Sequence, residues 1–109
     1  MYIPDKGDIV WLDFNPSAGQ EIKKTRPAFI ISREKFNRHT GIAIVAPITS
    51  TVKGMNLEVL LTDDLKTDGV VLVHQLRSLD FKQRSVKFIE KAQPIITEEV
   101  TQFASVIIK

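Results

Sequence analysis

The chain contains no cysteine, which excludes a disulfide framework, a thiolate nucleophile and a metal site built on thiolates. It also lacks any apolar run near the ~20 residues that a membrane-spanning helix requires. The first residues, MYIPDKGD, show neither the basic start nor the apolar stretch of a secretory signal peptide. We therefore expect a cytoplasmic protein without a membrane anchor.

Acidic residues are scarce in one segment, although the formal net charge of the whole chain is only +2. Residues 23–38 contain a single acid, Glu34, against a cluster of cations: Lys23, Lys24, Arg26, Arg33, Lys35 and Arg38. Such a segment suits an anionic partner. The same composition is common on a solvated face, so charge alone does not settle a function.

The chain has no repeat and no linker rich in Gly, Pro or Ser, so we expect one domain that spans residues 1–109. Short runs rich in Val, Ile and Phe are separated by clusters of turn-forming residues. This spacing predicts a mainly β fold with some α, a small SH3-like antiparallel β-barrel. The expected strands are residues 8–14, 28–32, 41–48, 57–61, 69–73 and 85–92.

The end of the chain changes to a helical period. We expect Thr97 to cap a C-terminal helix with Glu98 and Glu99 in its first turn, where carboxylates favour the helix dipole. Its apolar stripe should pack on the barrel. A shorter helix is expected after Ser32, with that serine as its cap. The stripe consists of Val100, Phe103, Ala104, Ile107 and Ile108.

Arg26 stands directly before Pro27, at the entrance to an expected strand. Proline fixes its own backbone and biases the preceding residue toward an extended conformation, so the position of Arg26 is restricted. A surface ion pair with Glu21 would account for the same arginine. The local sequence therefore leaves both a functional and a structural reading open.

Three segments, taken in order, resemble the MazF/PemK family of toxin endoribonucleases: GDIVWLDFNPSAGQEIKKTRPAFIIS, IVAPITS and GVVLVHQLRSLD. The family pattern has a G-[DE]-[IV]-[WY] start, then an acid and an Arg-Pro that enters a strand. A Pro-[IV]-Thr turn and a Gln followed two residues later by a basic residue complete it. Each piece is weak alone, but together they match from Gly7 through the terminal helix.

The resemblance implies the toxin of a type II toxin-antitoxin system, with a barrel like that of CcdB-type gyrase poisons and a C-terminal helix. It implies a homodimer that holds single-stranded messenger RNA in a groove and cuts it without a metal ion or another cofactor. Attack by the 2′-hydroxyl would leave 2′,3′-cyclic phosphate and 5′-hydroxyl ends and so inhibit translation and growth. A MazE-like antitoxin with an acidic segment would block the groove.

Such cleavage needs a proton acceptor for the 2′-hydroxyl, positive charge for the phosphorane and help for the departing 5′-oxygen. By resemblance, Arg26 is the catalytic arginine, whose planar fork braces two phosphate oxygens. Thr49 matches the threonine that contacts the scissile phosphate, and Glu21 matches a loop acid that acts as base or orients Arg26. Two histidines without cysteine form no ligand cluster, so we expect no metal site.

Other residues are expected to bind RNA. By resemblance, Gln75 reads a base edge or holds the strand end, and Arg77 and Arg84 contact the RNA backbone. Lys23 and Lys24 supply steering charge. Asn15 and Phe14 stand where they would border the groove, although core packing is the more ordinary role of Phe14.

Two positions depart from the family pattern. Gln20 stands where some members have a histidine, so no imidazole base comes from that loop. His74 stands where relatives often have Asp, Glu or Asn, and because histidine ordinarily titrates near pH ~6.5 it is a candidate for proton transfer. A polar strand-end role is the alternative. His39 is expected to be a solvent-exposed or structural turn residue.

Three rival functions remain open. A gyrase-poisoning toxin on the same fold needs no Arg26 centre, a non-catalytic RNA-binding module would bind without cutting, and a barrel that only mediates protein association would show no RNA affinity. The cleavage motif would depend on groove loops such as TSTVKGMN (residues 49–56) and TDDLKTDG (residues 62–69), whose contacts the sequence does not specify. The sequence does not identify the antitoxin either.

Overall fold

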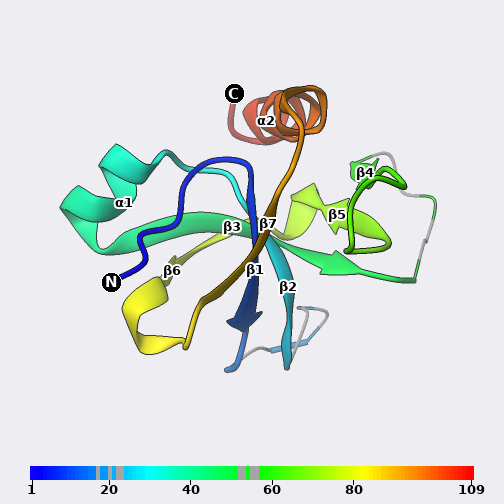
Figure 1. The fold of residues 1–109 in the computed structure, drawn as a ribbon. Helices are drawn as coiled ribbons and strands as arrows, with labels where there is room; N and C mark the ends of the chain where they lie inside the picture. Colours follow the sequence, from blue (N-terminus) through cyan, green and yellow to red (C-terminus); the bar gives the residue numbers. More distant parts are fainter. Residues whose placement is uncertain (17, 20, 22–23, 52–53, 55–56) are drawn as a thin grey trace.

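The structure of the chain is a computed structural model. It describes residues 1–16, 18–19, 21, 24–51, 54 and 57–109. Figure 1 shows a curved antiparallel sheet with helix α2 (Pro94–Ile108) across one face and helix α1 (Glu34–Thr40) at one end. The strands are β1 (Asp8–Asp13), β2 (Thr25–Ile30), β3 (Ile42–Thr49), β4 (Glu58–Leu60), β5 (Val70–Leu72), β6 (Arg77–Asp80) and β7 (Lys87–Lys91). Two single-turn 3₁₀ helices are η1 (Val73–Gln75) and η2 (Phe81–Gln83).

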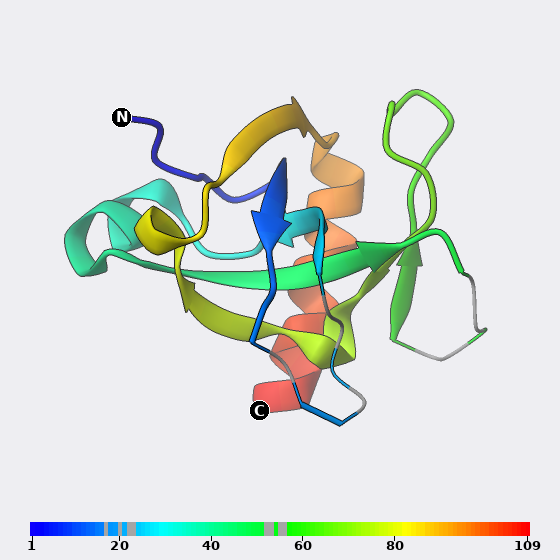
Figure 2. The ribbon, with the colours of Figure 1, turned by 90° about the horizontal axis from the view of Figure 1, so that it is seen from below.

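Strand β3 organises the sheet, and Figure 2 shows it crossing the whole molecule. The strand order is β4-β5-β3-β2-β1-β7, and β6 also pairs with β3. The start of β3 pairs with β6 and its last two residues pair with β5, while its other edge pairs with β2. Between the described strands no ladder joins β6 to β7, so the expected barrel is a curved, incompletely closed sheet.

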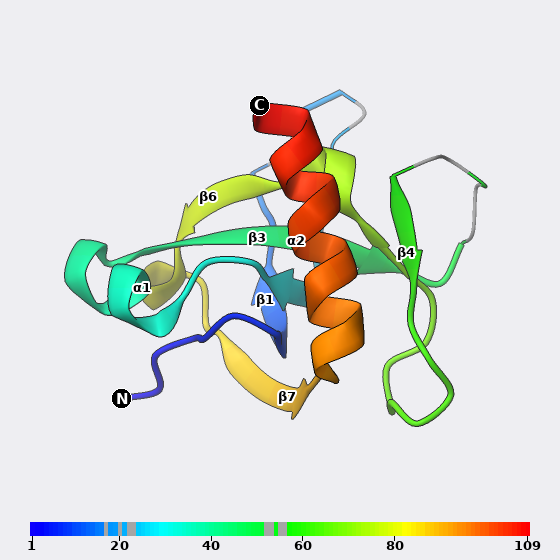
Figure 3. The same cartoon turned by 90° about the horizontal axis from the view of Figure 1, so that it is seen from above.

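Two apolar clusters fill the two faces of this sheet. Because neighbouring side chains of a strand point to opposite faces, Ile9 belongs to the cluster beneath α2 and Val10 to the other one. Helix α2 contributes Ile96, Val100 and Ala104, which recur at intervals of four residues along one face. Figure 3 shows α2 lying across the sheet, which confirms the expected C-terminal helix. The expected apolar stripe is only partly right, because Ile107 and Ile108 are exposed at the end of the helix and do not pack on the sheet.

Both helix starts differ from the sequence prediction. Helix α2 begins at Pro94 with Gln93 as its N-cap, and the Thr97 hydroxyl donates to the Gln93 carbonyl at 3.3 Å, so Thr97 is not the cap. Glu98 and Glu99 consequently lie beyond the first turn. Proline is well suited to the first helical position because it lacks the N–H that would be unpaired there.

Helix α1 begins at Glu34 with Arg33 at the cap position, so the expected Ser32 cap is also wrong. The Ser32 hydroxyl instead donates to the side-chain oxygen of the buried Asn37. His39, expected in a turn, is exposed in the last turn of this helix. None of the helices in the described part of the chain is long and apolar enough to cross a membrane.

Strand β6 was not among the strands expected from the sequence. Its four residues, RSLD, include only one apolar side chain, Leu79, which is buried between exposed or half-buried polar neighbours. The strand forms because the long β3 offers it a free edge, with Val45 opposite Arg77 and Ile42 opposite Asp80. A four-residue pattern is too short to reveal that partner.

Replacing Val100 with alanine tests the packing of α2 on the sheet. The Val100 side chain is 0% exposed, so we expect the free energy of unfolding to fall by about 1.5 to 3 kcal/mol. Urea unfolding followed by circular dichroism measures the loss. The neighbouring exposed Glu99→Ala is the control and should change stability by less than about 0.5 kcal/mol. Equal losses in both variants would contradict this packing.

Candidate active site

An open hollow of about 400 Å³, named here the Arg26 hollow, lies at the start of β2 and the end of β3. It receives side chains from β1, β2, β3, β7 and the loop between β4 and β5. Arg26 and Thr49, both expected at the site from the family resemblance, line it. The described residues that line it are Trp11, Arg26, Pro27, Ile48, Thr49, Ser50, Lys66, Thr67, Asp68 and Ile89.

Strand register explains why Arg26 and Thr49 meet. Ala28 of β2 is paired with Pro47 of β3 in an antiparallel ladder. The ladder ends at that pair, and its register continued by two residues would set Arg26 level with Thr49. Because side chains alternate with a period of two, Arg26 and Thr49 share the face of the Ala28–Pro47 pair, while Trp11, Pro27 and Ile48 come to the hollow from the other face.

The end of β3 is packed against a glycine. Gly69 has φ +114°, and a Cβ atom placed there would lie 2.1 Å from the Thr49 carbonyl oxygen. Only a residue without a side chain allows this approach. The Thr49 hydroxyl oxygen accepts a hydrogen bond from the Thr51 N–H at 3.2 Å, and a hydroxyl that accepts retains its own proton for donation.

One wall of the Arg26 hollow is held by Glu90 of β7. Its carboxylate accepts hydrogen bonds from the Lys66 N–H at 3.0 Å and from the N–H and hydroxyl of Thr67, both at 2.8 Å. Burial acts to raise the pKa of Glu90, but these hydrogen bonds outweigh it and the pKa lies below its ordinary value. The ionised carboxylate is therefore the favoured form.

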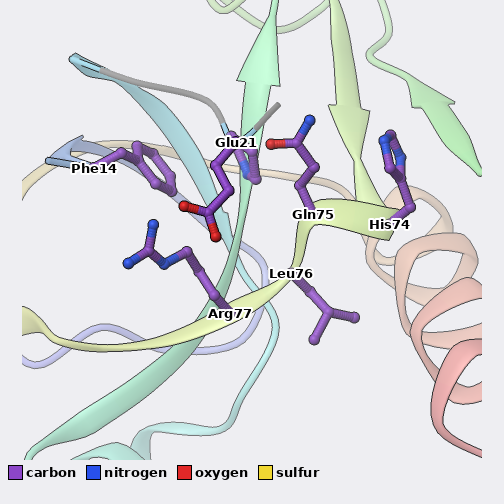
Figure 4. A pocket seen from close by; sticks show the side chains of 7 residues that line it. Phe14, Glu21, His74, Gln75, Leu76 and Arg77 are labelled. Carbon is purple, nitrogen blue, oxygen red and sulfur yellow. The ribbon is translucent and has the colours of Figure 1, made fainter. Parts of the chain in front are cut away.

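A second hollow of about 290 Å³, named here the Glu21 hollow, opens beside η1. It lies where the pairing along one edge of β3 passes from β5 to β6, next to Pro47, which has no N–H to donate. Figure 4 shows the carboxyl group of Glu21 and the guanidinium of Arg77 extending toward each other, while Leu76 points away. The described lining residues are Phe14, Glu21, Pro47, His74, Gln75, Leu76 and Arg77.

Two polar atoms at the Glu21 hollow are buried without a hydrogen bond to any described residue. Within the part of the chain that the structure describes, neither His74 Nδ1 nor Arg77 Nη1 has a partner. A buried polar group left unpaired costs about 1 to 3 kcal/mol, more when it is charged. A polar ligand in this hollow would relieve that cost.

Glu21 lies at the Glu21 hollow and is not among the residues that line the Arg26 hollow. One carboxylate oxygen accepts from the Ala18 N–H at 2.7 Å, and the Glu21 N–H donates to the Ala18 carbonyl at 3.1 Å. These two bonds hold the acid in its turn. The structure thus separates the four expected catalytic residues into two pairs, Arg26 with Thr49 and Glu21 with His74.

Arg84 and Asn15 have structural contacts. Arg84 Nη1 donates to the carbonyls of Asp13 and Asn15 and so holds the chain as it leaves β1. The Asn15 side-chain oxygen accepts from the Lys24 N–H at 3.2 Å. Lys24 is exposed and has a positive φ of 72°. Lys23 and Gln20, which the sequence analysis also considered, lie outside the described residues.

Several lining residues of the Arg26 hollow were not selected individually from the sequence, although the loop at residues 62–69 was expected to border the groove. Lys66, Thr67 and Asp68 come from a loop whose position only the folded chain reveals. Trp11 had a detectable signal, because alternation along β1 puts it on the face opposite Val10 and Leu12. It is 43% exposed and stands opposite Pro27.

Among the residues that the structure describes, no group of three or more His, Cys, Asp and Glu side chains is placed to hold a metal ion. The arrangement instead offers permanent positive charge at Arg26 and a hydroxyl donor at Thr49. Titratable groups line the neighbouring hollow. These are the functional groups that cleavage of a phosphodiester requires.

Comparison with known proteins gives a consistent result. A family model described as "PemK-like, MazF-like toxin of type II toxin-antitoxin system" matches residues 5–107. The endoribonuclease toxin MazF of Escherichia coli (strain K12) is 39% identical over 83 residues, which cover 76% of this chain and 74% of that protein.

Solved structures agree with this match. Crystal structures of MazF and of MazE-MazF from Deinococcus radiodurans superpose with TM-scores of 0.94 and 0.87, each at 37% identity. The matches cover 99% of this chain in both cases, and 98% and 97% of the matched chains in the two structures. The predicted fold class is thereby confirmed.

Replacing Gly69 with alanine tests the packing behind Thr49. A Cβ atom would collide with the Thr49 carbonyl, so β3 must shift and stability should fall by more than about 2 kcal/mol. Gly41→Ala is the matched control, because Gly41 also has a positive φ but open space around it. It should lose only about 1 kcal/mol. Thermal and urea unfolding compare the two, and equal losses would refute the close contact.

Proposed function

The chain belongs to the PemK-like, MazF-like toxins of type II toxin-antitoxin systems, and we propose that this toxin endoribonuclease cuts single-stranded messenger RNA in the Arg26 hollow. The observation that carries the proposal is the presence of Arg26 and Thr49 at one open hollow. A permanently charged, planar donor beside a hydroxyl is suited to a phosphate group.

In the proposed reaction the 2′-oxygen of one nucleotide attacks the adjacent phosphorus. The bond between phosphorus and O2′ forms, the bond between phosphorus and O5′ breaks, and the products are a 2′,3′-cyclic phosphate and a 5′-hydroxyl. Arg26 stabilises the extra negative charge on the phosphorane oxygens, and the Thr49 hydroxyl donates to one of them. These steps use groups of the protein and the substrate alone.

The proton of the 2′-hydroxyl must pass to a base, and the departing O5′ must gain a proton. Glu21 and His74 are the candidates for this proton transfer, and both line the neighbouring Glu21 hollow. A strand that occupied both hollows would bring a nucleotide next to them. We assign charge stabilisation to Arg26, since a guanidinium stays protonated in proteins.

The Glu21 hollow is the proposed place of RNA binding beyond the scissile phosphate. Arg77 Nη1 and His74 Nδ1, which have no hydrogen-bond partner among the described residues, support a polar occupant, and Gln75 adds an amide suited to a base edge. Lys23 and Lys24 would attract RNA at longer range, so binding should weaken with salt. Arg84 and Asn15 are proposed to help bind RNA by holding the chain that borders this hollow.

We propose a MazE-like antitoxin with an acidic segment as the protein partner, in line with the MazE-MazF structures of Deinococcus radiodurans. Its carboxylates would compete with RNA phosphates for the same cations. A homodimer and a cytoplasmic location, where messenger RNA is translated, complete the proposal.

Arg26→Ala tests the catalytic assignment. Purified protein is incubated with a long single-stranded RNA in EDTA, and cut sites and end groups are mapped by sequencing and phosphatase treatment. Wild type should give discrete cuts with cyclic phosphate and 5′-hydroxyl ends. Loss of a preorganised charge should slow cleavage by about 10²- to 10³-fold. Arg38→Ala, an exposed arginine of α1, is the control and should cut normally.

Normal cleavage by a folded Arg26→Ala variant would overturn the mechanism. Binding without cleavage by the wild type would identify an RNA-binding module, and a change in DNA topology with intact RNA would identify a gyrase poison.

His74→Asn tests proton transfer. A histidine base must be neutral to accept a proton, so the wild-type rate should rise with pH across neutrality and that dependence should flatten in the variant. The rate under single-turnover conditions between pH 5.5 and 8.5, a window of about three units around the ordinary histidine range, measures it. His39→Asn is the matched control because His39 is exposed on α1. An unchanged His74→Asn profile would return His74 to a structural role.

A further inference from the structure

The Arg26 hollow has a second cation. Among the described residues that line it, Lys66 is the only positively charged side chain besides Arg26. It comes from the loop between β4 and β5, whereas Arg26 comes from β2, so the two charges reach the hollow from separate elements. Figure 2 shows this loop standing beside the end of β3.

The loop that carries Lys66 is fixed at several points. The Leu61 N–H donates to the Gly69 carbonyl at 3.0 Å and closes its base. Leu65 is buried in the cluster beneath α2. Gln93 donates to a carboxylate oxygen of Asp64 at 3.0 Å. The part next to the hollow, Lys66 and Thr67, is held by the three hydrogen bonds to Glu90.

A β-bulge places Glu90 where it can make these bonds. Ile9 is paired with Glu90 and the next residue, Val10, is paired with Phe88, so Ile89 is an extra residue in β7. Bulges of this kind re-aim side chains. Here Ile89 lines the Arg26 hollow while the adjacent Glu90 holds the loop.

We propose that Lys66 binds a phosphate of the RNA strand next to the scissile one, and that Glu90 is a positioning residue that holds Lys66 at the hollow. The inference rests on the proposed function, because it assumes that RNA occupies the Arg26 hollow. The Lys66 ammonium is a compact charge on a flexible side chain, which suits contact with an adjacent phosphate. The planar guanidinium of Arg26, which can donate two parallel hydrogen bonds, suits the scissile phosphate better. Asp68 on the same wall repels phosphate and restricts where the strand passes.

The test compares Lys66→Gln, Glu90→Gln and the double variant. Lys66→Gln removes the charge but keeps the backbone N–H that donates to Glu90. We expect KM for RNA cleavage to rise about tenfold with kcat within about twofold, because a contact to a non-reacting phosphate stabilises substrate and transition state alike. The slope of log affinity against log salt should shrink by about 1.

Affinity has a direct readout in this protein. Trp11 is the only tryptophan of the chain and lines the same hollow, so its fluorescence should respond to a bound strand. A pool of 2′-O-methyl RNA oligonucleotides is the probe, since the blocked 2′-oxygen prevents cleavage. Glu99→Gln, on the exposed side of α2, is the control for Glu90→Gln, because both changes remove one negative charge. It should bind and cut RNA as the wild type does.

Glu90→Gln should shift KM and the salt slope in the same direction as Lys66→Gln. The double variant should bind RNA no more weakly than Lys66→Gln alone. Such non-additivity is expected when one residue acts through the other. Additive losses, or a lowered kcat with KM and salt slope unchanged, would show that Glu90 is merely structural. Normal KM and salt slope in Lys66→Gln would overturn the phosphate contact.

Two further variants keep the outcomes separate. If Glu90→Gln fails to fold, Thr67→Val removes only the hydroxyl bond to Glu90 and should give a smaller change of the same kind. Arg26→Ala in the same assay separates the two proposals: normal cutting by it would defeat the proposed function. Lost cutting by it together with a normal Lys66→Gln would defeat only this inference.

Discussion

The antiparallel pairing of β2 with β3 is the constraint on which the candidate site depends. With Ala28 opposite Pro47, the ends of both strands carry Arg26 and Thr49 to the same place. A slip of one residue would turn one of the two side chains to the other face. The register is protected because the buried side chains of both strands would have to leave their clusters as well.

Besides its pairing with Ala28, Pro47 affects the other edge of β3. Pro47 cannot donate a ladder hydrogen bond, and near it the pairing on the other edge of β3 gives way to η1. This break creates the Glu21 hollow and leaves polar atoms of His74 and Arg77 buried without partners among the described residues. Interrupted pairing and unsatisfied polar groups weaken a fold, and both tend to persist at functional sites.

Much of this arrangement was predictable because it is local or periodic. Alternation identified most strands, helical spacing identified α2, and the Arg-Pro and Pro-Ile-Thr segments, through the family resemblance, identified Arg26 and Thr49. The separation of Glu21 from the Arg26 hollow and the hold of Glu90 on its loop were not predictable. Both depend on contacts between residues distant in sequence. The prediction of the α2 cap was wrong for a smaller reason: the helix begins at Pro94, which is favoured at a first helical position, and so it starts before Thr97.

The loop between β4 and β5 shows how a site of two charges can be kept open. At one end Gly69 lets the loop lie against the Thr49 carbonyl, and near the other wall Glu90 holds Lys66 and Thr67. The first contact fixes the loop to β3, which carries Thr49. The second fixes it to β7, which is not the strand that carries Arg26. Since like charges repel, attachment of the two cations to separate elements of the fold helps to keep both at the hollow. The fold supplies that separation before any phosphate is bound.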